Sequence, residues 1–217
     1  MDGKAKRRTR DPAGTRASIL EAASNLLAKD GPEGISLSAV AHLAGVNRGT
    51  AYQHFETREK LVQATIDFVS EKLFRAVFGD PATIGERHVE TVDIADLGDR
   101  LAGFAMDNPE LCRVWFQQVL ASPDPANDPF WREYCGSFGR FAATDLAEPD
   151  IDVEVVAIMM LAGVFFWPIW ARAHGEDEAT RGRLARRFAD ETLRLSIFGT
   201  MKAKAFPEIV ERLGSRA

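Results

Sequence analysis

Glycine and proline residues divide this chain of 217 residues into segments of helical length. Within these segments apolar residues recur every three or four positions, and no run of alternating apolar and polar residues stands out as a strand. The sequence therefore predicts an all-α fold, with turns such as Gly31-Pro32 and Asn108-Pro109 between helices. We expect helices at about residues 15–29, 37–44, 48–54, 58–78, 87–106, 109–121, 127–146, 151–174 and 179–198, and a short one after Phe206-Pro207.

The second and third predicted helices are short and closely spaced. Ser36 is placed to cap the second helix, Gly45 to end it in a left-handed conformation, and Asn47 to cap the third. Thr15 is the expected N-cap of the first helix and Thr57 that of the fourth. Two helices joined by a turn of about three residues that contains glycine form a helix-turn-helix.

Positive charge is concentrated at the N-terminus of an otherwise acidic chain. The first 16 residues carry six Lys and Arg against two Asp and Glu, whereas the whole chain has a net charge of -5. This asymmetry indicates an anionic polymer as partner of the N-terminal part. We expect residues 1–14 to form a basic arm suited to a minor groove, through Lys4, Lys6, Arg7, Arg8 and Arg10.

Cysteine usage and the N-terminus indicate the compartment. Cys112 and Cys135 are too far apart for a CxxC metal or redox site, and two thiols in a chain of this length suggest a reducing environment. The first residues lack the apolar stretch of a secretory signal. We expect a cytoplasmic protein without a disulfide.

The third predicted helix is rich in hydrogen-bonding side chains. At helical spacing its outward face holds Arg48, Gly49, Tyr52 and Gln53, while Ala51 and Phe55 turn inward. Arg48 can donate two hydrogen bonds to guanine and Gln53 can pair with adenine, whereas Gly49 lets the backbone approach a groove wall. Other polar side chains of the two helices and their caps can reach phosphate oxygens: Ser36, Asn47, Thr50, Tyr52 and His54. The plainer alternative is a solvated face of a small helical bundle.

These residues resemble the DNA-binding region of the TetR family of transcriptional regulators. The resemblance covers about residues 15–61: Thr15-Arg16, the pattern IL.AA..LL...G, then S..AVA..AGVNRGTAYQHF and TREKL. It implies a helix-turn-helix domain at 15–61, a fourth helix as connector, and a larger helical domain at 62–217 for ligand binding and dimerisation. In that family Arg48 and Gln53 would help to read bases, and Ser36, Thr50, Tyr52 and His54 would hold the backbone. Arg58 stands where the family usually has Lys and would contact phosphate.

The second half of the chain has aromatic residues at helical spacing. An apolar cavity for a small organic molecule is one interpretation of them, and plain core packing is the other. The candidate ligand-binding residues are Phe104, Trp115, Val119, Tyr134, Phe138, Phe141, Met160 and Trp167. The predicted helices 151–174 and 179–198 can pair with their copies in a second subunit as a four-helix bundle.

The sequence thus favours a homodimeric regulator, a repressor released from a palindromic operator in double-stranded DNA by a small apolar or aromatic effector. No cofactor, metal site or catalytic residue is expected, because no HExxH, P-loop, GxSxG or dinucleotide-binding pattern occurs. One alternative is a helical small-molecule-binding protein or enzyme that retains the helix-turn-helix only as scaffold. Another is a membrane anchor at residues 155–171, which lack charge; we favour a buried subunit interface for them instead.

Overall fold

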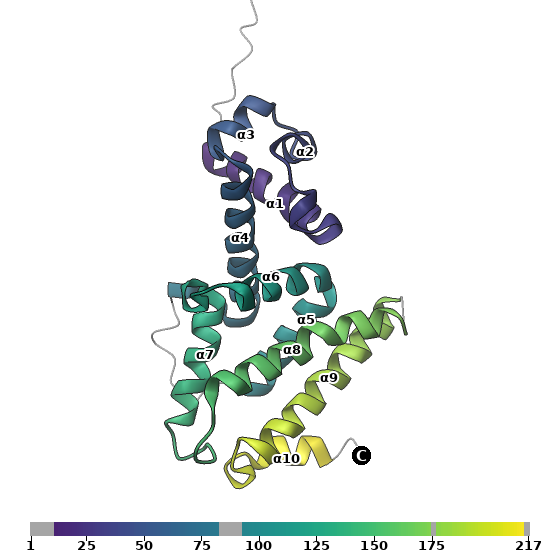
Figure 1. The fold of residues 1–217 in the computed structure, drawn as a ribbon. Helices are drawn as coiled ribbons and strands as arrows, with labels where there is room; N and C mark the ends of the chain where they lie inside the picture. Colours follow the sequence, from purple (N-terminus) through teal and green to yellow (C-terminus); the bar gives the residue numbers. More distant parts are fainter. Residues whose placement is uncertain (1–10, 83–92, 175–176, 215–217) are drawn as a thin grey trace, which may run out of the picture. The chain divides into compact units, whose positions relative to one another are not determined.

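The computed structural model describes residues 11–82, 93–174 and 177–214, which fold into helices joined by short turns (Figure 1). The predicted all-α class is confirmed, since the only extended pairing in these three stretches is an isolated bridge between Ala147 and Met201. Contacts divide the chain into two units, Met1–Val69 and Ser70–Ala217. The α-helices are α1 Pro12–Asp30, α2 Leu37–Leu43, α3 Arg48–His54, α4 Arg58–Phe78, α5 Ile94–Asp107, α6 Pro109–Ala121, α7 Pro129–Ala142, α8 Val153–Arg172, α9 Glu178–Gly199 and α10 Pro207–Gly214.

The N-terminal unit confirms most of the predicted helix caps. The Ser36 hydroxyl accepts from Ala39 N at 3.1 Å, and the Asn47 carboxamide oxygen accepts from Thr50 N at 2.7 Å. Gly45 follows α2 with φ 66°, a left-handed conformation that suits glycine. Thr57 accepts from Lys60 N at 3.2 Å and so caps α4.

The predicted start of the first helix is wrong. Asp11, not Thr15, is the N-cap, because its carboxylate accepts from Ala13 N at 3.0 Å and Pro12 occupies the first helical position. Thr15 lies inside the first turn and donates its hydroxyl to Asp11 O at 2.9 Å. The fully buried side chains of α1, α2 and α3 include a set of apolar residues, namely Ile19, Ala23, Leu27, Val40 and Ala51, all 0% exposed.

Several helix boundaries in the C-terminal unit also differ from the prediction by one or more residues. Aspartate caps fix the observed starts of α5, α7, α8 and α9, through Asp93, Asp128, Asp152 and Asp177. Part of the helix predicted at 87–106 lies outside the described residues. The helix predicted to reach residue 146 ends at Ala142, where the Thr144 hydroxyl donates to Phe141 O at 2.7 Å and a turn begins.

One carboxylate joins three helices of the C-terminal unit. Asp128, which caps α7, accepts from Trp131 N at 2.9 Å, from Trp115 Nε1 on α6 at 2.9 Å and from Ser70 Oγ on α4 at 2.8 Å. Aromatic rings pack around this point, with the Trp115 and Phe130 ring centroids 5.3 Å apart in an edge-on arrangement. The core of this unit is therefore organised about one hydrogen-bonded acidic group.

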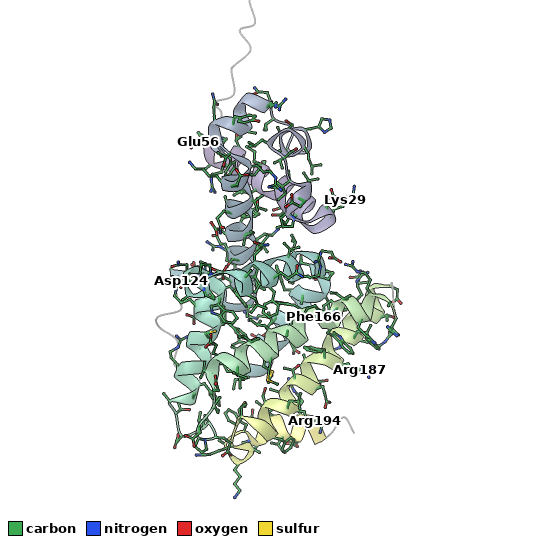
Figure 2. The ribbon with its side chains drawn as sticks, in the orientation of Figure 1. Lys29, Glu56, Asp124, Phe166, Arg187 and Arg194 are labelled. Carbon is green, nitrogen blue, oxygen red and sulfur yellow. The ribbon has the colours of Figure 1, made fainter. Side chains whose placement is uncertain are left out.

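Of the described helices, α8 is long and apolar enough to cross a membrane by length and composition. Only 28% of its most apolar stretch is buried within the chain. Large side chains exposed along α8 include Val155, Met159, Phe166 and Trp170, and Phe166 is labelled in Figure 2. The unusual feature of α8 is thus an apolar face that its own chain leaves open.

Asp128 should contribute far more stability than an ordinary helix cap. We expect Asp128→Ala to lower the free energy of unfolding of the C-terminal unit by about 2–4 kcal/mol, because three donors lose their acceptor. All four tryptophans lie in this unit, so tryptophan fluorescence during urea unfolding reports on it alone.

Asp152→Ala is the matched control, since that carboxylate caps α8 through one bond to Val155 N and we expect a loss of only about 1 kcal/mol. Equal losses in the two variants would contradict the role of Asp128 as a junction.

Candidate nucleic-acid interface and ligand cavity

Helix α3 has one buried and one exposed side. Thr50 is 5% exposed and Ala51 is fully buried, whereas Arg48, Gly49, Tyr52 and Gln53 lie on the exposed side. The turn before it is held by hydrogen bonds from Gly45 N to His42 O at 3.2 Å and from Val46 N to Ala41 O at 3.0 Å. Packing therefore fixes α3 while the predicted base-reading face stays in contact with solvent.

The two largest side chains of this face lie beside each other. The Arg48 guanidinium carbon is 5.9 Å from the centroid of the Tyr52 ring, one helical turn away, and Tyr52 is 45% exposed. A guanidinium near an aromatic face is favoured electrostatically, and it keeps its donors available. Both side chains are thus held at the surface, and among the described residues Arg48 has no ion pair that would have to break before it binds a ligand.

The other predicted contact residues are placed in two ways. Ser36, Asn47 and Gln53 are exposed, and the half-buried His54 ring lies 6.4 Å from that of Phe55. Thr50, in contrast, turns inward and donates its hydroxyl to the Asn47 carboxamide oxygen at 3.0 Å. Its predicted phosphate contact therefore finds no exposed hydroxyl in this structure.

Arg58 also differs from the expectation that it contacts phosphate. Its guanidinium donates to Ile35 O at 2.9 Å and to Pro32 O at 2.7 Å, and it pairs with Glu33 at 3.1 Å. The two carbonyls belong to the loop that leads into α2, and the fork of an arginine suits two acceptors at once. Arg58 thereby ties the start of α4 to the loop before the helix-turn-helix.

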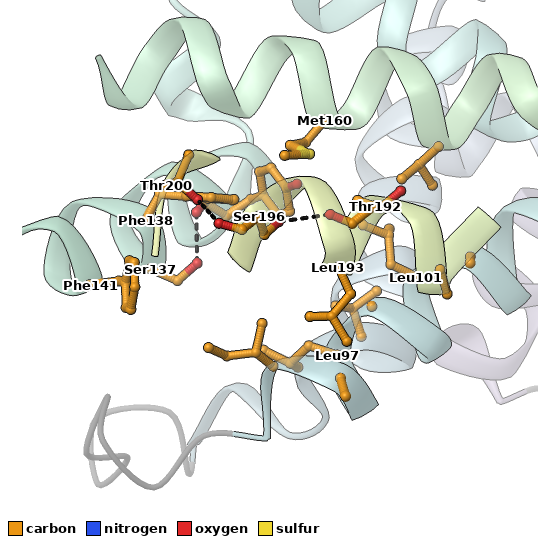
Figure 3. Close-up of a pocket in the computed structure, with 18 of the residues that line it drawn as sticks. Leu97, Leu101, Ser137, Phe138, Phe141, Met160, Thr192, Leu193, Ser196 and Thr200 are labelled. Atoms are coloured by element: carbon orange, nitrogen blue, oxygen red, sulfur yellow. Dashed lines mark hydrogen bonds between the residues drawn. The ribbon is translucent and has the colours of Figure 1, made fainter. Parts of the chain in front are cut away.

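A cavity of about 190 Å³ lies within the C-terminal unit, between α4, α5, α7, α8 and α9 (Figure 3). Four of the predicted ligand-binding residues line it: Tyr134, Phe138, Phe141 and Met160. Burial raises the pKa of the Tyr134 phenol far above its usual range, so this group stays protonated at neutral pH.

The other four predicted ligand-binding residues do not line this cavity. Trp115 is fully buried in the core with its indole N–H on Asp128, and Val119 is also buried. Trp167 donates its indole N–H to Leu184 O at 3.1 Å and so joins α8 to α9. Phe104 is half-buried on α5, outside the lining.

Sequence reasoning missed the walls that α4, α5 and α9 contribute. These are Val77 and Phe78, Leu97 and Leu101, and a polar row of Thr192, Ser196 and Thr200 with Leu193 beside it. The row was visible as hydroxyl residues at every fourth position, two of them in the predicted helix 179–198 and the third, Thr200, just after it. Within the described stretches no group of three or more His, Cys, Asp or Glu is placed to hold a metal ion.

The geometry of α2, the turn at 44–47 and α3 defines the N-terminal unit as a helix-turn-helix domain. Residues 19–65 match the family model of the bacterial regulatory proteins, tetR family. The match lies within the N-terminal segment and confirms the resemblance to the tetR family seen in the sequence.

Two similar curated proteins agree with this assignment. An HTH-type transcriptional repressor of Mycobacterium tuberculosis is 39% identical over 75 residues, 34% of this chain and 40% of that protein. The HTH-type transcriptional regulator TtgR of Pseudomonas putida is 46% identical over 66 residues, 30% of this chain and 31% of that protein. The matched part thus spans less than half the length of these relatives.

Solved structures extend the likeness to both units. A gamma-butyrolactone receptor has a TM-score of 0.61 at 24% identity, covering 95% of this chain and 99% of that one. The TetR-family protein CprB of Streptomyces coelicolor, in complex with its operator sequence, has a TM-score of 0.62 at 24% identity, covering 93% and 97%. At this level of identity the likeness establishes the fold, an N-terminal helix-turn-helix unit followed by a helical unit.

The guanidinium of Arg58 should stabilise the loop before α2. We expect Arg58→Lys to speed amide hydrogen exchange in residues 35–43 by an amount equivalent to about 1–2 kcal/mol, because a lysine ammonium lacks the fork that reaches both carbonyls.

Lys60→Ala is the control, because the Lys60–Glu56 ion pair is exposed and should contribute about 0.5 kcal/mol or less. Unchanged exchange in Arg58→Lys would show that the two carbonyl contacts do not stabilise this loop.

Proposed function

We propose that the protein is a ligand-responsive transcriptional regulator that binds a specific sequence in double-stranded DNA. The observation that carries this proposal is the solvent-exposed polar face of α3, with Arg48, Gly49, Tyr52 and Gln53 on a helix whose other side is buried. A purely structural helix has no reason to carry a glycine that lowers helix stability by about 1 kcal/mol. A helix-turn-helix that enters a major groove does, because the backbone must approach the duplex closely.

Base reading falls to Arg48 and Gln53 in this proposal. Arg48 donates to guanine O6 and N7, and Gln53 pairs with adenine. Tyr52, Ser36, Asn47 and His54 contact the sugar-phosphate backbone and hold the register. Thr50 and Arg58 do not contact DNA in this proposal. Thr50 holds the Asn47 side chain that caps α3, and Arg58 holds the loop that leads into α2.

The exposed apolar face of α8 and α9 is the proposed dimer interface. On α8, Met159 is 67% exposed and Phe166 53%, and on α9, Leu195 is 62% and Phe198 66% exposed. An open apolar surface of this kind is covered by a partner in most soluble proteins, and a second copy places two reading helices on a palindromic site. This arrangement also accounts for the apolar character of α8 in a cytoplasmic protein.

Not every large apolar residue of α9 faces outward. The Phe188 ring packs over Gly163 of α8, so close that a side chain on Gly163 would lie 3.3 Å from the ring. Phe188 also lines the cavity. The proposed interface therefore uses Leu195 and Phe198, near the end of α9.

The cavity is the proposed effector site, and α4 is the proposed connection to the DNA-binding unit. Val77 and Phe78 at the end of α4 line the cavity, while Arg58 at its start binds the loop before α2. An effector that moves the end of α4 changes the spacing of the two α3 helices in the proposed dimer, and the operator is released. The repressor and the gamma-butyrolactone receptor among the similar proteins support this scheme. A coupling of about 1–3 kcal/mol corresponds to a 5- to 150-fold change in DNA affinity.

Sequence-specific binding should depend on Arg48. We expect the chain to select a palindromic duplex from a random pool, and Arg48→Ala to weaken binding to that duplex by about 1–3 kcal/mol with relaxed preference at one base pair per half-site. Tyr52→Phe should weaken all sequences alike, since a phosphate contact carries no base information. The measurement is a fluorescence-anisotropy titration of the selected and random duplexes at several salt concentrations.

Lys29→Ala is the charge-matched control, because Lys29 is an exposed cation of the same unit in the last turn of α1, away from α3. Sequence reading is refuted if the selected duplex binds no better than random DNA, or if Arg48→Ala and Lys29→Ala have the same effect.

Self-association should depend on the exposed face of α8 and α9. We expect the wild-type chain to sediment as a dimer at micromolar concentration, and Met159→Glu or Phe198→Glu to weaken the dimer about 100-fold or more, because two-fold symmetry buries each new charge twice. Sedimentation velocity across a dilution series measures this.

Leu120→Glu is the control, since Leu120 is a similarly exposed leucine, at 48%, on α6. A wild-type monomer, or a dimer that Leu120→Glu disrupts and Phe198→Glu does not, would contradict the proposed interface.

A further inference from the structure

The cavity has a row of aliphatic hydroxyls along one wall, and most of its other lining residues are apolar. Thr192 and Ser196 of α9 and Thr200, the residue after its end, follow each other at every fourth position and line the cavity together, and Ser137 of α7 adds a fourth aliphatic hydroxyl (Figure 3). The rest of the lining includes apolar residues such as Leu97, Leu101 and Met160. A ligand in this space therefore meets hydrogen-bonding groups on one wall.

The protons of these hydroxyls are largely engaged within their own helices. Ser196 Oγ donates to Thr192 O at 3.0 Å, and Thr200 Oγ1 donates to Ser196 O at 3.0 Å. Ser137 Oγ likewise donates to Tyr134 O at 2.7 Å. A hydroxyl has one proton and two lone pairs, so these three oxygens are left as acceptors.

Thr192 differs from the other three. Its hydroxyl has no hydrogen-bond partner among the residues that the structure describes, and it can therefore donate as well as accept. The wall thus combines several acceptors with one available donor. A ligand hydroxyl matches this combination, because it also both donates and accepts.

The charged groups at the cavity cancel each other. Of the described lining residues only Glu133 and Arg140 are charged, and their side chains form an ion pair at 2.5 Å. Glu133 is the more buried partner, at 17% exposure against 49% for Arg140. A carboxylate ligand would have to compete with Glu133 for the guanidinium, so the cavity disfavours an anion.

From these observations we infer that the effector is an uncharged, mainly apolar molecule that carries a hydroxyl group, and that this hydroxyl binds the Thr192–Ser196 end of the polar wall. The cavity volume of about 190 Å³ fits one substituted ring. This inference rests on the proposed function in taking the cavity as the effector site. It adds the chemical class of the effector and the residues that select it.

Three probes that share a propylphenyl frame separate this class from its neighbours. Calorimetric titration of the full chain compares 4-propylphenol with 4-propyltoluene, in which a methyl replaces the hydroxyl, and with 4-propylbenzoate. A cavity without hydrogen-bonding groups binds the toluene more tightly, since the phenol loses hydrogen bonds to water. We expect the phenol to bind about threefold to tenfold more tightly than the toluene, and the benzoate to bind most weakly.

The variant Thr192→Val with Ser196→Ala should reverse this preference. The toluene should bind at least as well as to wild type, which also shows that the cavity has folded, while the phenol loses about tenfold. Ser24→Ala is the matched control, because Ser24 Oγ makes the same kind of bond, to Leu20 O at 2.8 Å, in the N-terminal unit. Its preference should equal that of wild type.

The inference is overturned if the wild type prefers the toluene or the benzoate, if it binds none of the probes, or if the double variant keeps the phenol preference. None of these titrations contains DNA. If the chain prefers the phenol but binds no operator, the proposed function is refuted and the ligand class stands. If the chain binds an operator but does not prefer the phenol, the ligand class is refuted and DNA binding stands.

Discussion

The Asp128 carboxylate is the interaction on which the architecture of the larger unit depends. It receives hydrogen bonds from Ser70 of α4, Trp115 of α6 and the first turn of α7. Ser70 Oγ in turn accepts from Phe130 N at 3.3 Å, so α4 and α7 are linked twice. Since α4 and α7 both supply cavity walls, this directional polar junction helps to set the space between these two walls.

The N-terminal unit solves a different problem, which is to keep a polar helix exposed and still fixed in place. Each group that packs α3 lies on its inner side, and Asn47 satisfies both the amide and the hydroxyl of Thr50. Arg58 provides the remaining constraint by holding the carbonyls of Pro32 and Ile35. A lysine, the usual residue of the family at this position, can carry the charge but cannot span both carbonyls, so the arginine adds a structural contact here.

The sequence predicted correctly those features that depend on residues close together in the chain. Ser36, Gly45 and Asn47 act within one turn of themselves, and these caps were read correctly. Thr15 was misassigned because Asp11 satisfies the same rule four residues earlier with Pro12 behind it. The cavity depends on which helices meet: nothing local distinguishes Trp115, whose indole binds Asp128, from Phe138, which lines the space. Side-chain size and helical spacing therefore predicted the cavity lining correctly for half of the candidate ligand-binding residues and wrongly for the other half.

Helix α9 combines the two features on which regulation would depend. Ser196 faces the cavity, whereas the adjacent Leu195 and nearby Phe198 are exposed on the proposed interface. A helix is too stiff for one side to move independently of the other, so a ligand that shifts the hydroxyl wall also shifts the apolar face. By thermodynamic reciprocity, a ligand that favours one arrangement of the dimer must bind that arrangement more tightly by the same factor. Under the proposed function, the polar wall of α9 would therefore couple the choice of ligand to the geometry of the subunit pair.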